Sequence, residues 1–76
     1  MSSIPVEVDM TLRLREERQR RDWSLVDVTM RTGISSADLS LVERGLKPAF
    51  PGWRRRIAKA FNMPESELFR EVKGDS

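Results

Sequence analysis

The chain has 76 residues, 34% of them charged, with a formal net charge of +2 and neither cysteine nor histidine. This inventory excludes disulfides, zinc sites built from Cys or His, thiol nucleophiles and His-based acid–base catalysis, and we expect a single domain with a thin core. Residues 13–59 hold 12 of the 14 basic residues but only 6 of the 12 acidic residues, a local excess of six positive charges that suits a polyanionic partner.

The first nine residues show no sustained apolar period, so we expect a loose arm over residues 1–9. Good helix formers without Gly or Pro follow from Met10 to Arg21 and predict the first helix, with Asp9 as its N-cap. The apolar face of this helix is sparse, and its second half is almost entirely charged. Its register against the rest of the fold is therefore open.

Two further helix starts lie eleven residues apart. Ser24–Asp27 and Ser35–Asp38 both have the pattern of a capping box, in which a Ser oxygen and an acid three residues later satisfy free backbone amides. Gly33 lies where the first of these two helices must end, in a left-handed conformation that glycine adopts without steric cost. The pattern predicts a helix-turn-helix over residues 25–44.

A basic run, Arg54 to Arg56, lies near the start of a fourth predicted helix that opens at Pro51. Proline suits the first turn of a helix, but three cations there oppose the helix dipole, so we expect an arginine of this run to contact phosphate. A short last helix is predicted over residues 63–69, and a flexible tail over residues 71–76.

Several segments share the spacing of one known family. They are Leu14–Glu16, Ser24, Gly33–Ser35, Leu39–Gly45, Pro48, Ile57–Phe61 and Glu67–Phe69. On these residues the chain resembles the helix-turn-helix domains of the lambda repressor and Cro type, the xenobiotic response element family. The resemblance implies an all-α, compact five-helix bundle with a central helix-turn-helix, formed here by residues 10–70.

The resemblance also implies site residues, with the recognition helix over residues 35–44 in the major groove of DNA. Base contacts are expected at Ser36, Ala37, Ser40 and Leu41. Phosphate contacts are expected at Ser24, Arg44, Lys47, Arg54 and Arg55. No Gln, Asn or Arg stands at the central reading positions, so the directional pairs that discriminate bases most strongly are missing.

Three regions depart from the family pattern. Leu25 stands where the family often places a Gln that reaches DNA, and Thr29 replaces an Ala where two helices cross, so these helices are expected slightly further apart. In the first helix, alignment without a gap places Glu17 at an apolar position. In that register Arg18 is expected to form a structural ion pair with Glu43.

These features predict a transcriptional regulator of the repressor type that binds double-stranded DNA, with a palindromic operator read by a homodimer. No pair of carboxylates with a fixed spacing and no Gly-rich phosphate loop is present, so we expect neither enzymatic activity nor a cofactor. The chain also lacks an apolar run that could span a membrane. We expect a cytoplasmic protein of a bacterium or phage, associated with the nucleoid.

Two alternatives remain open. The basic centre can be a solvated surface without a partner. The same fold can also serve as a protein–protein interaction module, for a partner regulator or as an antitoxin, with Leu25 and Leu41 in the interface. We expect Phe50 and Trp53 in the core or at a subunit interface rather than stacked on bases.

Overall fold

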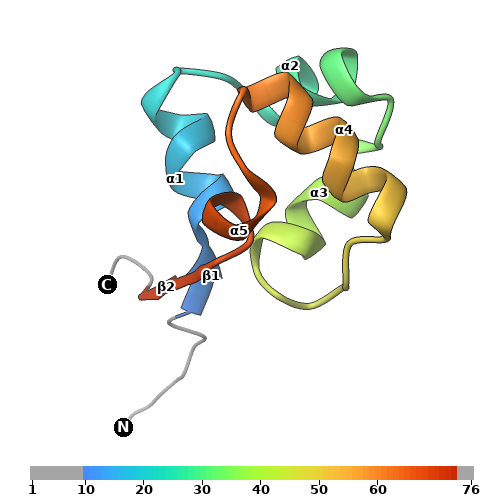
Figure 1. The fold of residues 1–76 in the computed structure, drawn as a ribbon. Coiled ribbons are helices and arrows are strands. Elements are labelled where there is room, and N and C mark those ends of the chain that lie inside the picture. Colours follow the sequence, from blue (N-terminus) through green and yellow to red (C-terminus); the bar gives the residue numbers. More distant parts are fainter. Residues whose placement is uncertain (1–9, 74–76) are drawn as a thin grey trace, which may run out of the picture.

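The computed structural model describes residues 10–73, which form five helices and a two-stranded sheet (Figure 1). The elements in chain order are β1 (Met10–Leu12), α1 (Arg13–Arg20), α2 (Leu25–Thr32), α3 (Ser36–Glu43), α4 (Pro51–Phe61), α5 (Glu65–Leu68) and β2 (Glu71–Lys73). The predicted five-helix bundle with a central helix-turn-helix is confirmed. The expected arm over residues 1–9, its N-cap Asp9 and residues 74–76 lie outside the described residues.

The sheet corrects two predictions at the ends of the domain. Helix α1 begins at Arg13 rather than at Met10, because the three residues before it form β1. This strand pairs antiparallel with β2, with Thr11 opposite Val72. The flexible tail expected after residue 70 is therefore wrong for Glu71–Lys73. A strand of three residues is too short to show an alternating pattern, and its partner lies at the other end of the chain.

The N-termini of α2 and α3 are both capped by serine, but in different ways. Ser24 Oγ accepts from the Asp27 amide at 3.1 Å, and the Ser24 amide donates to Asp27 Oδ2 at 2.8 Å, which confirms the predicted capping box. Ser35 Oγ accepts from the Asp38 amide at 3.1 Å. The Asp38 carboxylate instead accepts from Lys47 Nζ at 2.7 Å, so the second box is only half formed.

The turn between α2 and α3 follows from one glycine. Gly33 has a φ of +78°, and its amide donates to the Thr29 carbonyl at 2.8 Å, which ends α2 as predicted. Any residue with a Cβ at this φ is strained, so the sharp change of direction depends on glycine.

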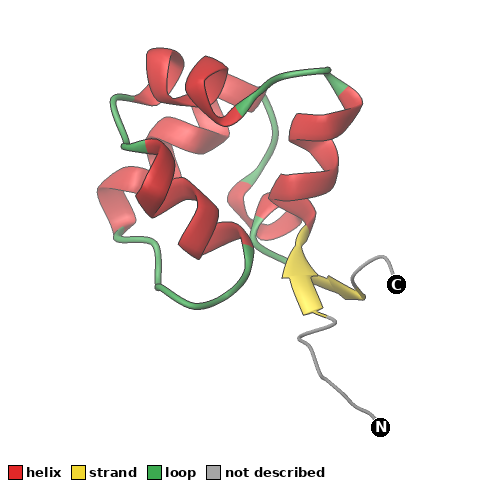
Figure 2. Cartoon of the chain, turned by 180° about the vertical axis from the view of Figure 1, so that it is seen from behind, coloured by secondary structure: helices red, strands yellow, loops and turns green. Residues whose placement is uncertain are grey.

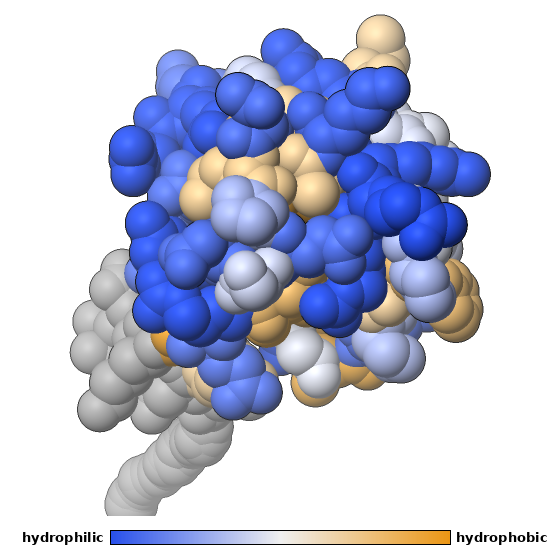
Figure 3. All heavy atoms as spheres, viewed as in Figure 1, coloured by the Kyte–Doolittle hydropathy of each residue, from blue (hydrophilic) through white to orange (hydrophobic). Residues whose placement is uncertain are grey.

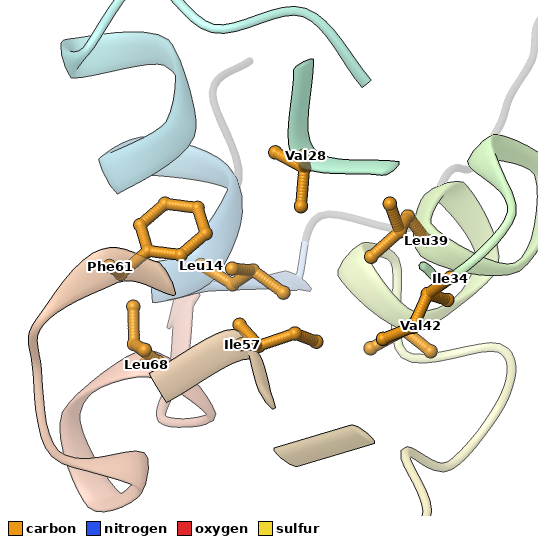
Figure 4. Packing of buried hydrophobic residues seen from close by; sticks show 8 residues of the cluster. All are labelled: Leu14, Val28, Ile34, Leu39, Val42, Ile57, Phe61 and Leu68. Atoms are coloured by element: carbon orange, nitrogen blue, oxygen red, sulfur yellow. The ribbon is translucent and has the colours of Figure 1, made fainter. Parts of the chain in front are cut away.

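One apolar core holds the helices together (Figure 4). Its fully buried members are Leu14, Val28, Ile34, Leu39, Val42, Ile57, Phe61 and Leu68, contributed by all five helices and the turn. Seen from behind, the two strands project from one end of this bundle, beside α1 (Figure 2). The core thus fixes α2 and α3 against α1, α4 and α5, and leaves the opposite side of α3 at the surface.

Candidate nucleic-acid interface

The surface side of α3 carries the residues expected to contact bases. Leu39, Val42 and Glu43 are buried on its inner side. The outer residues span an arc of about 140° on a helix with about 100° per residue. They are Ser36, Ala37, Ser40, Leu41 and, at the C-cap, Arg44. Ala37 and Arg44 are exposed and the other three are half-buried, so the structure brings all four expected base-contacting residues to one short face.

One hydroxyl on this face is already hydrogen-bonded within the protein. Ser36 Oγ lies 3.0 Å from Thr29 Oγ1, which belongs to α2. The side chain that we expected to separate the two helices slightly thus joins them through a hydrogen bond at the point where they cross.

The cations expected to contact phosphates differ in whether they already form ion pairs within the protein. Arg44 is exposed, and its Nε donates at 3.4 Å to the Ser40 carbonyl, with no acidic partner in the described part of the chain. Lys47 Nζ is paired with Asp38 at 2.7 Å and lies 5.6 Å from the centre of the Trp53 ring.

The three successive arginines of α4 point in different directions. Arg54 Nε pairs with Glu65 Oε1 at 3.3 Å, and its guanidinium lies over the ring of Phe69. Arg56 Nη1 donates to the Thr32 carbonyl at 3.5 Å, at the end of α2. Arg55 is exposed and has no ion pair or side-chain hydrogen bond within residues 10–73.

The structure brings Arg18 and Glu43 together. Arg18 Nε donates to Glu43 Oε2 at 2.7 Å, and Arg18 Nη2 donates to Glu43 Oε1 at 3.1 Å. A third bond runs from Arg18 Nη1 to the Trp23 carbonyl at 2.9 Å. The side chains of Arg18 and Glu43 are only 13% and 4% exposed. The pair joins α1 to the inner side of α3. This contact is the one expected when α1 is aligned with the family without a gap.

A second charged cluster on α1 was missed in the sequence. Glu17 is only 3% exposed, and its carboxylate accepts from Arg13, Arg20 and Arg21, with Arg21 Nη1 closest at 2.6 Å. The hydrogen bond from Arg21 lowers the pKa of Glu17 below its ordinary value of 4.5, although burial opposes this shift. The sequence did contain a signal for this cluster, since the alignment without a gap places Glu17 at a position that is usually apolar. The surrounding arginines explain how an acid can be buried there.

A basic hollow of about 410 Å³ lies between α2 and α4, and Arg31, Arg56 and Lys59 contribute to its lining. Two of these cations already serve the fold. Arg31 stacks on Trp23 at 4.1 Å and donates to a carbonyl of α2, and Arg56 donates to another carbonyl at the end of α2. Arg31 and Arg56 lie at the C-terminal end of α2, where cations complement the helix dipole, so both side chains stabilise this helix.

Some apolar side chains are exposed on the surface outside α3. The face in Figure 3 is largely hydrophilic, with smaller apolar areas near its centre and at its lower and right-hand edges. Phe50 is 53% exposed and packs edge-on against Trp53 with ring centres 4.8 Å apart, while Trp53 itself packs on the core. Within residues 10–73, no helix is long and apolar enough to cross a bilayer.

The helix-turn-helix domain family matches residues 9–69. Uncharacterized HTH-type transcriptional regulators of Mycobacterium bovis and of two strains of Mycobacterium tuberculosis are each 33% identical over 57 residues. The aligned segment is 75% of this chain but 22% of each relative, so the chain spans about a fifth of the length of the curated relatives it matches. No solved structure matches the chain.

Proposed function

Because the chain belongs to the helix-turn-helix domain family, we propose that it binds a specific sequence of double-stranded DNA and regulates transcription as a repressor. The family and the similarity to relatives named as transcriptional regulators support a DNA-binding regulator at the level of the family. The observation that carries the proposal is the outer face of α3, a short and weakly polar surface held at a fixed angle by the core beneath it.

In this proposal α3 enters the major groove and its outer side chains meet base edges. The hydroxyls of Ser36 and Ser40 can form hydrogen bonds with bases, and Ala37 and Leu41 can pack against a thymine methyl group. Such contacts discriminate weakly. DNA shape and a second subunit then supply much of the specificity.

The phosphate contacts are proposed for the cations that the fold leaves free. Arg44 and Arg55 are exposed and carry no acidic partner within the described residues. Lys47 and Arg54 must exchange their ion pairs with Asp38 and Glu65 before they meet DNA, which reduces the gain from each contact. Ser24 is exposed and can donate its hydroxyl proton to a phosphate without giving up its cap.

The active species in this proposal is a homodimer on a palindromic operator, in the cytoplasm of a bacterial or phage-infected cell and on its nucleoid. Two recognition helices related by a two-fold axis read half-sites about one helical turn apart. The exposed Phe50 next to Trp53 offers apolar area for the contact between subunits.

Selection from a randomised duplex pool, repeated across a salt series, tests the proposal. We expect enrichment of a palindromic site and an affinity that falls steeply with salt. Ala37→Asp should abolish retention because it places a negative charge on the exposed reading face, whereas Ser66→Asp adds the same charge at an exposed position of α5 and should not. If the unmodified chain is not retained even at low salt, the proposal is wrong.

One observation favours the interaction module as the second candidate. Val26 and Met30 lie one turn apart on the same side of α2 and are 60% and 79% exposed, so together they form an apolar area that a partner could cover. A protein partner at these residues predicts that Met30→Lys abolishes partner binding and leaves any DNA binding intact.

A further inference from the structure

Two hydroxyl groups meet where α2 crosses α3. Thr29 Oγ1 and Ser36 Oγ are 3.0 Å apart, both residues are half-buried, and Ser36 is the first residue of α3. The second threonine at the end of α2 behaves differently. Thr32 Oγ1 donates to the Val28 carbonyl of its own helix at 2.8 Å. The hydroxyl of Thr29 is therefore directed at the neighbouring helix, toward a side chain of the proposed reading face.

A serine hydroxyl has one proton and two acceptor positions, and a free one rotates to suit whatever base it meets. A hydrogen bond to a fixed partner removes part of this freedom. If Ser36 accepts from Thr29, its own proton and one lone pair remain, and the proton can be donated to acceptors such as guanine O6, purine N7 or thymine O4. If Ser36 donates to Thr29, only its lone pairs remain, for the amino groups of adenine or cytosine. In both cases the bond to Thr29 restricts the rotation of the Ser36 hydroxyl and limits the directions from which it can meet a base.

We propose that Thr29 is a positioning residue that fixes the orientation of the Ser36 hydroxyl and so determines base preference at the N-terminal end of α3. This inference rests on the proposed DNA binding. It assigns a specificity role to a side chain of α2 that itself lies behind the reading face. It also explains how a recognition helix without amide or guanidinium groups at its centre can still prefer one base over another.

Binding of purified chain to duplexes that vary one base pair of the selected operator at a time tests the inference. Thr29→Val keeps the shape of the side chain and removes the hydroxyl, so we expect the preference at one base pair of each half-site to fall about three- to tenfold, the scale of one neutral hydrogen bond. Thr29→Ser keeps the hydroxyl and should retain the preference. Ser36→Ala should remove the same preference, and Thr29→Val should then add nothing to it.

The outcomes separate this inference from the proposed function. If Thr29→Val weakens binding to all duplexes equally and leaves the preference profile unchanged, the inference is overturned and DNA binding stands. If the unmodified chain binds no duplex, the function fails and this role of Thr29 fails with it. The hydrogen bond is also measurable without DNA. A double-mutant cycle of Thr29→Val and Ser36→Ala on thermal stability should show coupling, and additive effects would contradict the inference.

Discussion

At the scale of single residues, the stability of this domain depends on Arg18. Its guanidinium binds both oxygens of Glu43 and the carbonyl of Trp23, and it thereby connects α1, α3 and the loop before α2. Burial of two charges costs solvation energy, so such a pair is maintained by good geometry rather than by charge alone. Loss of one partner leaves the other buried and uncompensated.

Arg18→Ala should therefore lower the free energy of unfolding by about 3–5 kcal/mol, since that is the usual cost of breaking a buried pair from one side. This is a large part of the stability of a domain of this size. Arg18→Lys keeps the charge but loses the two parallel hydrogen bonds to Glu43. Its free energy of unfolding should lie between those of the unmodified chain and Arg18→Ala. Chemical denaturation of the three proteins measures the order, and an unchanged midpoint for Arg18→Ala would contradict this account.

The two charged clusters on α1 differ in how far the sequence reveals them. The contact between Arg18 and Glu43 is implied by the family resemblance once the register of α1 is chosen. Glu17 had no such support, because a carboxylate at an apolar position looks like an error of alignment. Its burial depends on Arg13 and Arg20 of the same helix and on the C-cap residue Arg21, which also donates to the carbonyl of Phe61 on α4. That tertiary contact is not visible in local spacing.

At the scale of elements, the N-terminal half of α4 distributes three neighbouring arginines among three environments. Successive residues of a helix point about 100° apart, so Arg54 reaches α5, Arg56 reaches the end of α2, and Arg55 remains in solvent. The sequence predicts that not all three can meet one surface. It does not predict which one is free, because that depends on where Glu65 and Thr32 lie.

Arg55→Ala should reduce the slope of log affinity against log salt by about one, the effect of one lost phosphate contact. Arg54→Ala is the matched control, since it removes the same charge from the adjacent position. It should reduce the slope less, because Arg54 is already paired with Glu65. Fluorescence titrations of one operator duplex at four salt concentrations measure both slopes. Equal slopes for the two variants would show that the ion pair with Glu65 does not keep Arg54 from contacting phosphate.

The caps and the strands show what local sequence does and does not determine. The starts of α2 and α3 are visible because a serine and an acid three residues later act within one turn. The pairing of β1 with β2 joins residues about sixty positions apart and includes too few residues for a pattern. The pairing of β1 with β2 is therefore visible only in the folded structure and not in the sequence pattern.

Truncation after Arg70 should destabilise the domain by about 1–2 kcal/mol, because it leaves the backbone of β1 without its partner. Truncation after Lys73 retains β2 and should have the stability of the full chain. Thermal unfolding of the three proteins measures the difference. If residues 71–73 form a flexible tail in solution, both truncations will unfold with the full chain.

At the scale of the whole molecule, carboxylates in three places connect stability to pH. The pKa of Glu17 is lowered from 4.5 chiefly by Arg21, that of Asp27 from 3.8 by the backbone amide of Ser24, and that of Asp38 from 3.8 by Lys47. In each case the unfolded chain binds protons more readily than the folded one as the pH falls. The stabilisation is therefore complete above the ordinary pKa and is lost as the pH falls through the lowered one.

The melting temperature should thus be nearly constant from pH 7 to about pH 5 and should then fall, with the steepest loss below the ordinary pKa of 4.5. Glu17→Gln should start lower at pH 7, because three arginines lose their shared carboxylate, and should lose less stability on acidification. Glu16→Gln is the control, since it removes a half-exposed carboxylate from the same turn and should follow the unmodified chain. Calorimetry at five pH values measures the three profiles. If Glu17→Gln loses as much stability on acidification as the unmodified chain, the charged cluster on α1 does not govern the acid response, and the caps of α2 and α3 must carry it.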